Sequence, residues 1–162
     1  MHDRTDHVTG RAGTVPSKEL RPRETRRSLP IALLRAREAV MSKFRPMLAR
    51  HDISEQQWRV IRVLAEHGEM DATQLAERAL VLGPSLTRMI KSLAGRKLLI
   101  IRRDKKDGRR TLLAASAKAR SLIAGITPES TQIHASIESR FGKPEMEKLL
   151  DLLEKIAAGL RE

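Results

Sequence analysis

The sequence predicts a mainly α-helical protein that carries one small β-hairpin. Apolar residues make up 40% of the 162-residue chain but aromatic residues only 2%, so the core is expected to be aliphatic. With 32% charged residues, this composition is typical of helical proteins. Apolar residues also recur at spacings of three and four along most of the chain, as on one face of a helix. One stretch departs from that period: the charged run DKKDGRR, residues 104–110, lies between two apolar stretches.

Two helices are predicted first. Ser28 can cap a helix over residues 28–49, along which apolar side chains form one continuous stripe. Pro46 is expected to kink or end this helix, because proline cannot donate the backbone hydrogen bond of a helix interior. The sequence SEQQ at residues 54–57 forms a capping box, which opens a second helix that is expected to stop near Gly68.

Two shorter helices follow. Asp71 is expected to begin a third helix, and residues 82–84 form a break after it. Ser85 or its neighbour is then expected to begin a fourth helix, which ends at Gly95. The charged run comes next, as the tip of a predicted hairpin whose turn signal is Asp-Gly.

The C-terminal part is predicted to be helical. Ser116 can cap a long helix, which residues 142–144 break before a final amphipathic helix. Helices over about 28–49 and 116–160 carry more apolar surface than a small helical domain needs. We expect them to interleave with the same helices of a second copy in a homodimer, with an intramolecular bundle as the alternative.

Two short helices followed by a hairpin predict a winged helix-turn-helix over about residues 54–114, with a helical dimerisation region on either side. The helix over 84–95 would be the recognition helix: its hydroxyls allow close approach to DNA, and its cations reach guanine edges or phosphates. Backbone N–H groups at the start of the third helix can hold phosphates. The helix residues expected to contact DNA are Thr73, Ser85, Thr87, Arg88 and Lys91. An ordinary solvated helix surface is the alternative.

The hairpin strengthens the prediction of DNA binding. Residues 98–114 contain six Lys and Arg residues and two Asp residues, and the tip is expected to be a wing that lies against phosphates or enters the minor groove. Asp104 or Asp107 is expected to brace Arg109 through a charge-assisted hydrogen bond. The wing residues expected to contact DNA are Arg103, Lys105, Lys106, Arg109 and Arg110. A charged turn that is merely exposed to solvent is the alternative.

The charge of the whole chain favours the same partner. The formal net charge is +12 and the isoelectric point about 11.0, which is typical of binding to double-stranded DNA, with an anionic membrane surface as the second option. Residues 1–27 contain seven Lys and Arg residues and four Asp and Glu residues, without an apolar period, and are predicted to form a flexible basic tail. No apolar run approaches the ~20 residues of a membrane span, and no signal-peptide pattern opens the chain, so we expect a cytoplasmic protein without membrane contact. The chain has no cysteine, which excludes disulfides, thiolate metal sites and cysteine nucleophiles.

The order of these elements and the wing motif resemble the MarR family of winged-helix regulators over about residues 28–160. The segment DGRR within IRRDKKDGRR is similar to the family's wing signature, with Asp107 and Arg109 at its acidic and basic positions. The segments RSLPIALLRAREAVMSKFRPML and SEQQWRVIRVL resemble the branch that regulates homoprotocatechuate and 4-hydroxyphenylacetate breakdown. This resemblance implies a repressor that a small aromatic carboxylate releases from DNA, and the two-fold symmetry of the expected homodimer predicts a pseudo-palindromic operator. It also implies an effector pocket formed by Trp58 and Arg62, with Ser28 from the partner subunit's first helix.

The residues themselves are compatible with such a pocket. Trp58 and Arg62 are four apart and project from one face of the second helix. An indole offers a stacking surface, and a guanidinium binds a carboxylate through two hydrogen bonds. A core tryptophan beside a surface arginine is the alternative. Candidate residues at the rim of the pocket are Glu55, Arg59 and His134.

Other classes of function find less support. An enzyme would need catalytic groups from the histidines, which show neither metal-ligand nor triad spacing: His2, His7, His51, His67 and His134. We therefore expect no catalysis, no metal and no cofactor. A ligand-independent DNA-binding regulator or architectural protein shares the winged helix and differs only at the pocket.

Overall fold

The computed structural model describes residues 25–105 and 107–160. The chain divides into two compact units, Met1–Arg37 and Glu38–Glu162. In the first unit, the described residues form the 3-10 helix η1 (Thr25–Arg27) and the first part of helix α1 (Leu29–Ala49). Of the predicted basic tail, only the residues of η1 lie within the described part of the chain.

Helices α1 and α2 begin near the predicted positions. Pro46 lies inside α1 and does not end it: the helix continues to Ala49, and the Pro46 carbonyl accepts a hydrogen bond from the Arg50 N–H at 3.3 Å. Helix α2 (Glu55–His67) has the predicted capping box, in which the Ser54 hydroxyl accepts the Gln57 N–H at 3.2 Å. In return, the Gln57 side chain accepts the Ser54 N–H at 3.0 Å. The prediction of this cap from the sequence is confirmed.

Helices α3 (Ala72–Ala79) and α4 (Gly83–Gly95) form the helix-turn-helix. Asp71 caps α3 by accepting the Gln74 N–H at 2.9 Å, while the Gln74 side chain accepts the Asp71 N–H at 3.3 Å. Helix α4 begins two residues before Ser85, because a proline in the first turn of a helix removes only an N–H that has no partner there. The break that was expected at residues 82–84 is therefore the beginning of α4.

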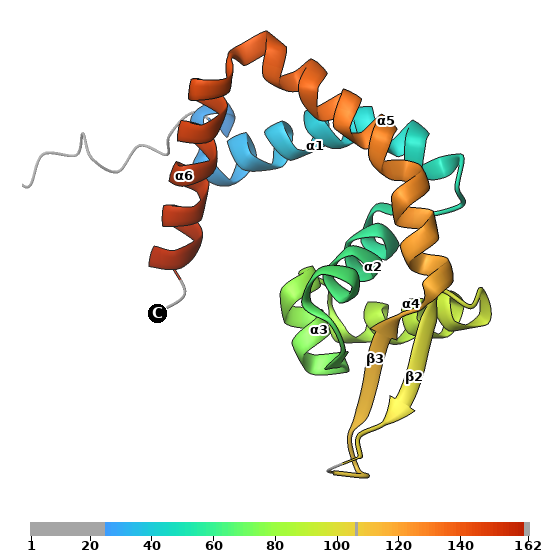
Figure 1. Cartoon of the computed structure of the whole chain (residues 1–162). Helices are drawn as coiled ribbons and strands as arrows, with labels where there is room; N and C mark the ends of the chain where they lie inside the picture. The colour runs from blue at the N-terminus through green and yellow to red at the C-terminus, as the bar shows by residue number, and fades with distance from the viewer. Residues whose placement is uncertain (1–24, 106, 161–162) are drawn as a thin grey trace, which may run out of the picture. The chain divides into compact units, whose positions relative to one another are not determined.

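The sheet has three strands and not two. Strands β2 (Leu99–Arg103) and β3 (Thr111–Ala115) form the predicted hairpin, and β1 (Met70–Asp71) pairs with the other edge of β3. All pairs are antiparallel, with Leu113 opposite both Met70 and Ile101. Figure 1 shows the hairpin extending from the helix-turn-helix, with β2 and β3 side by side.

One aliphatic core joins the end of α1, helices α2, α3 and α4, the base of the sheet and the helix that follows the sheet. Its side chains come from the inward faces of these helices and from one face of the sheet, since alternate strand residues point to opposite faces. The core side chains that are most completely buried are Met47, Leu48, Val60, Ile61, Leu64, Leu75, Leu86, Leu93, Leu113 and Ile126. The helix-turn-helix and the base of the wing are therefore parts of one packed body.

The two C-terminal helices are α5 (Ala117–Phe141) and α6 (Lys143–Gly159). Ser116 caps α5 as predicted, accepting the Ala119 N–H at 3.1 Å. Gly142 separates the helices with φ = +87°, a conformation that favours glycine. Helix α6 buries none of its residues and leaves several leucines about half exposed. Among the described helices, none is long and apolar enough to cross a membrane.

Candidate nucleic-acid interface

Helix α4 presents a polar face opposite its buried face. Leu86, Met89 and Leu93 are buried against the core. The predicted contact residues Thr87, Arg88 and Lys91 are exposed, and Ser85 is half-buried. Thr73, in the first turn of α3, is also exposed. The structure thus brings all five predicted helix residues to the helix-turn-helix surface.

The Thr87 hydroxyl donates a hydrogen bond to the Gly83 carbonyl at 3.2 Å. The hydroxyl oxygen therefore keeps its acceptor lone pairs for a base or a water molecule. No acidic residue lies within α4, whose sequence is GPSLTRMIKSLAG. A face with two hydroxyls, an arginine and a lysine, and no carboxylate of its own, is suited to contact an anionic polymer.

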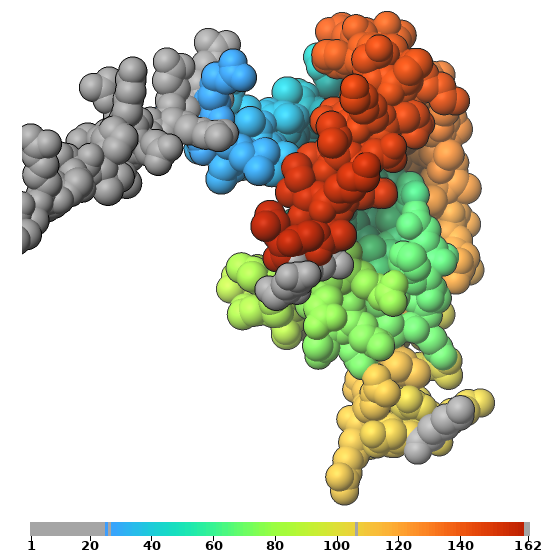
Figure 2. Space-filling view, turned by 90° about the vertical axis from the view of Figure 1, so that its left-hand side faces the viewer, coloured from blue at the N-terminus to red at the C-terminus, as the bar shows by residue number. Residues whose placement is uncertain are grey.

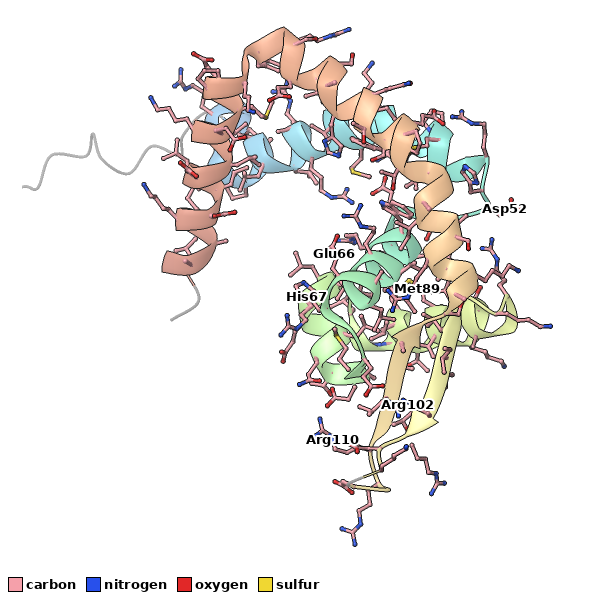
Figure 3. The ribbon with its side chains drawn as sticks, in the orientation of Figure 1. Asp52, Glu66, His67, Met89, Arg102 and Arg110 are labelled. Atoms are coloured by element: carbon pink, nitrogen blue, oxygen red, sulfur yellow. The ribbon has the colours of Figure 1, made fainter. Side chains whose placement is uncertain are left out.

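The wing stands out from the helical body in the space-filling view of Figure 2. Two ion pairs connect it to residues that directly precede α3: Arg102 pairs with Glu69, and Arg110 pairs with Asp71. Figure 3 shows Arg102 and Arg110 on the hairpin. Since Arg102, Leu112 and Asp71 lie opposite one another in the sheet register, these pairs share one face of the sheet. Sequence reasoning placed Asp71 at the beginning of a helix but missed both ion pairs, because the two carboxylates lie far from the wing along the chain.

The tip of the wing is held by backbone hydrogen bonds. The Arg110 N–H donates to the Asp107 carbonyl at 2.9 Å, and the Asp104 N–H donates to the Arg110 carbonyl at 2.9 Å. The Asp107 carboxylate accepts the backbone N–H of Arg109 at 3.0 Å. The predicted brace between Asp107 and Arg109 is therefore made through the Arg109 backbone, so that Asp107 shapes the turn that carries the guanidinium.

The wing cations fall into two groups. Arg102 and Arg110 are paired with carboxylates, as described above. The side chains of Arg103, Lys105 and Arg109 are exposed and form no ion pair with any residue that the structure describes. Lys106, also predicted to contact DNA, lies outside the described residues. The charges free to meet phosphate are thus concentrated at the tip.

Asp71 has a role in both elements that it joins. Its pKa is lowered, first by the hydrogen bond from the Gln74 N–H and then by the Arg110 side chain. The carboxylate is therefore ionised at neutral pH while it caps α3 and holds the wing strand. One side chain fixes the beginning of α3 and the second strand of the wing to each other.

The predicted effector residues Trp58 and Arg62 lie together on α2. The Arg62 guanidinium carbon lies 5.7 Å from the centre of the Trp58 ring, within the range of a cation–π contact. Arg62 also pairs with Glu66, four residues later, which sequence reasoning missed. Ser28 is half-buried, just before α1, in the first of the two units.

The three predicted rim residues have different surroundings. Glu55 accepts a hydrogen bond from the Arg45 side chain at 2.5 Å. The His134 ring lies 4.9 Å from the Phe44 ring, centre to centre. Arg59 is half-buried, and its Nε is buried without a hydrogen-bond partner in the described part of the chain. Such an atom is costly to bury, and of these three residues only Arg59 has an unmet hydrogen-bonding need.

Within residues 25–105 and 107–160, no group of three or more His, Asp or Glu side chains could hold a metal ion. The surface that stands out chemically is the basic face formed by α4 and the wing.

Comparisons with known proteins agree with this arrangement. The model of the MarR family matches residues 51–110. Over 131 residues the chain is 38% identical to the homoprotocatechuate degradative operon repressor of Escherichia coli, an alignment that covers 81% of this chain and 88% of the repressor.

Solved structures resemble the whole arrangement of helices and wing. NadR in complex with 4-hydroxyphenylacetate is 37% identical, with a TM-score of 0.74 over 81% of this chain and 96% of that chain. CouR bound to a 23-mer DNA duplex is 26% identical, with a TM-score of 0.75 over 86% of this chain and 99% of that chain. The fold and family predicted from the sequence are confirmed, and the relatives are regulators and not enzymes. The chain belongs to the MarR family of DNA-binding transcriptional regulators.

Proposed function

We propose that the chain is a homodimeric repressor that binds a pseudo-palindromic operator and is released from it by a small aromatic carboxylate. The observation that carries the proposal is the basic surface of α4 and the wing, whose tip cations have no partner among the described residues. The names of the relatives support the finer terms: one represses a homoprotocatechuate operon, and one is solved with 4-hydroxyphenylacetate. A repressor acts where the DNA is, so we assign it to the cytoplasm.

The proposed division of labour follows the elements. Residues of about 54–114 form the DNA-binding winged helix, and helices over about 28–49 and 116–160 form the dimer interface. Helix α6 supports this division, because it buries none of its residues although Leu149, Leu150 and Leu152 are about half exposed. A helix with an apolar face normally buries it against another element, and a second copy of the chain supplies one.

In the proposed complex, α4 enters the major groove and the wing tip lies against the backbone or in the minor groove. The residues proposed to contact DNA are Thr73, Ser85, Thr87, Arg88, Lys91, Arg103, Lys105, Lys106, Arg109 and Arg110. Arg110 differs from the other cations of this set, because its ion pair with Asp71 holds the wing strand and already balances its charge, so its contact with DNA is expected to neutralise little phosphate charge. Two such units related by a two-fold axis would read half-sites about one helical turn apart.

The proposed effector site is centred on Arg62 and Trp58. The guanidinium can bind a carboxylate through two hydrogen bonds, and the indole can stack on an aromatic ring. The pair is already preorganised by its 5.7 Å contact. The buried Nε–H of Arg59, one residue after Trp58, could donate a hydrogen bond to a further polar group there. Ser28 remains a prediction from the family resemblance.

The proposed mechanism is a competition between two dimer geometries. The effector would favour a geometry in which the recognition helices are wrongly spaced for the operator, which requires tighter binding to that geometry. By linkage, operator DNA must weaken effector binding by the same factor by which effector weakens operator binding. Unchanged effector affinity in the presence of saturating operator would contradict this mechanism.

The proposal can be tested by footprinting the full-length protein on the DNA upstream of its own coding sequence. The footprint is then repeated in the presence of a panel of aromatic acids. We expect a symmetric protected site that at least one aryl acid exposes. Arg62→Ala should protect the same site but lose the response to acid. Sedimentation of the free protein should give a dimer, and a monomer would refute the proposed assembly.

A ligand-independent regulator is the second candidate, and one observation favours it. Arg62 is already paired with Glu66, as expected of a surface arginine with a structural role. A thermal-shift screen separates the candidates, because a ligand at 100 times its Kd stabilises its protein by roughly 2.7 kcal/mol. No shift with any aromatic acid, together with a normal footprint, would favour this second candidate.

A further inference from the structure

The turn between α3 and α4 presents two leucines to solvent. Leu80 is 72% exposed and Leu82 is 79% exposed, whereas Val81 between them is buried. Single exposed leucines are common on protein surfaces and need no explanation by themselves. These two differ, however, in their positions: Leu80 ends α3, and Leu82 immediately precedes the first residue of α4.

Leu82 occupies the N-cap of the recognition helix, a position for which leucine is poorly suited. It has extended backbone angles and no side-chain hydrogen bond to the free N–H groups of the first turn. Ser, Thr, Asp or Asn would provide that bond. Helices α2, α3 and α5 each have such a cap, from Ser54, Asp71 and Ser116. The helix thus loses stability at this position, and its leucine gains no burial in return.

The backbone around Leu82 is exposed to solvent at the beginning of α4. A Cβ added to Gly83, the next residue, would meet no atom within 4 Å. The Leu82 carbonyl accepts the Leu86 N–H at 2.9 Å, so the backbone is fixed at the beginning of the helix. The predicted base-contacting residues Ser85 and Arg88 follow in the first two turns of α4. Leu82 is therefore an exposed apolar residue with a fixed backbone, directly before the helix that carries the predicted base contacts.

We propose that Leu82 contacts the C5-methyl group of a thymine in the major groove and makes the protein selective for thymine at that position. The inference rests on the proposed function, in which the N-terminal end of α4 enters the major groove. The methyl group of thymine is the one apolar group that base pairs display in that groove. Because the Leu82 side chain is 79% exposed, a contact with this methyl group would remove apolar surface of both groups from water, which favours binding.

The test uses the full-length protein and a duplex that it selects from a random-sequence pool. Synthetic copies carry deoxyuridine, which lacks the C5-methyl group, in place of one thymine at a time in both half-sites. Burial of one methyl group corresponds to about fourfold in affinity. At one thymine position, replacement by deoxyuridine in both half-sites should therefore lower the affinity of the wild-type protein for the duplex roughly fifteenfold. Leu82→Ser should bind the duplex with this substitution and the duplex without it equally well.

The Leu82→Ser variant also distinguishes loss of the DNA contact from loss of folding. Serine is a favoured N-cap residue, so the melting temperature of the variant should not fall. Leu82→Asn provides a second cap-forming variant with the same expected result. Leu80→Asn is the matched control: it removes an equally exposed leucine from the same turn and should keep the wild-type response to deoxyuridine.

The outcomes distinguish the two levels of the argument. If the wild-type protein selects no duplex, the proposed function fails. If it selects one but no thymine methyl group affects its affinity, the thymine contact is refuted while the function stands. The contact is also refuted if Leu82→Ser retains the wild-type response to deoxyuridine, or if Leu80→Asn abolishes it.

Discussion

Arg109→Ala should flatten the salt dependence of operator binding, whereas Arg110→Ala should leave it nearly unchanged. The two arginines are neighbours in the wing, but the side chain of Arg110 is paired with Asp71, while the side chain of Arg109 forms no ion pair in the described part of the chain. A cation that neutralises a phosphate releases counterions from DNA, and this release is what makes affinity depend on salt. An arginine whose charge Asp71 already balances contributes little to that release.

The size of the effect follows from the number of wings. Each neutralised phosphate contributes about 0.9 to the slope of log affinity against log salt concentration. Because the proposed dimer has two wings, Arg109→Ala should reduce the slope by about 1.8. Raising the salt concentration from about 50 to about 200 mM should then cost the wild-type protein roughly tenfold more affinity than it costs the variant.

Fluorescence anisotropy with a labelled operator duplex, at four or more salt concentrations, measures this slope. Sedimentation of each variant checks that the dimer is intact, and a duplex of unrelated sequence reports non-specific binding. An Arg109→Ala slope equal to that of the wild type would remove Arg109 from the phosphate contacts. A drop for Arg110→Ala as large as that for Arg109→Ala would refute the division of the wing cations into paired and free.

Three further predictions concern stability, pH and effector affinity. Leu80→Asn should raise the free energy of unfolding, measured with urea, by about 1 kcal/mol. The backbone at Leu80 is left-handed (φ = 51°), a conformation that disfavours leucine and that asparagine tolerates. A lower free energy of unfolding for the variant would show that the Leu80 backbone is not strained. Asp71→Asn keeps a good N-cap but removes the charge, and the folded-state pKa of Asp71 is lowered by a backbone N–H of α3 and by Arg110. A carboxyl group whose pKa is lowered by folding stabilises the folded state at pH values above its unfolded pKa of about 3.9, and this stabilisation is lost as the pH falls through its folded pKa. The difference in the free energy of unfolding between wild type and variant should therefore be constant from pH 7 to about 5 and shrink below about pH 4. Glu66→Gln should strengthen binding of aromatic carboxylates up to about fivefold by calorimetry, because Glu66 competes for Arg62, and should not change binding of an uncharged phenol.

The elements predicted correctly from the sequence are those that short-range interactions determine. The caps of α2 and α5 depend on Ser54 and Ser116 and on residues within three positions of them. Pro46 does not end α1, because the buried side chains of Phe44 and Met47, on either side of it, hold the helix in place through tertiary packing. Strand β1 was missed for a related reason: its two residues pair with β3, about forty residues away, and carry no strand pattern of their own.

The candidate site shows the same limit. The wing cations stand in one charged run, so their gathering at a hairpin tip could be predicted from the run and its Asp-Gly turn. The sequence could not predict which of these cations form ion pairs. Glu69 and Asp71 lie before α3 and meet Arg102 and Arg110 only when the sheet forms. Leu82 was counted as part of a break, since the period of apolar residues gives no sign that a leucine outside the core faces solvent.

The ion pairs of the wing matter more for geometry than for stability. Pairs as exposed as Arg102 with Glu69 and Arg110 with Asp71 contribute at most about 1 kcal/mol each, because water screens them and long side chains lose freedom when they pair. Their position is what distinguishes them, since both connect the hairpin to residues that directly precede α3. Thr73, a proposed phosphate contact, lies in that first turn, so fixing the β3 strand to Asp71 fixes the distance between this contact and the wing tip. A wing held in this way already has a fixed orientation before it binds the duplex. The unpaired cations at its tip can therefore contribute to binding with less loss of conformational entropy.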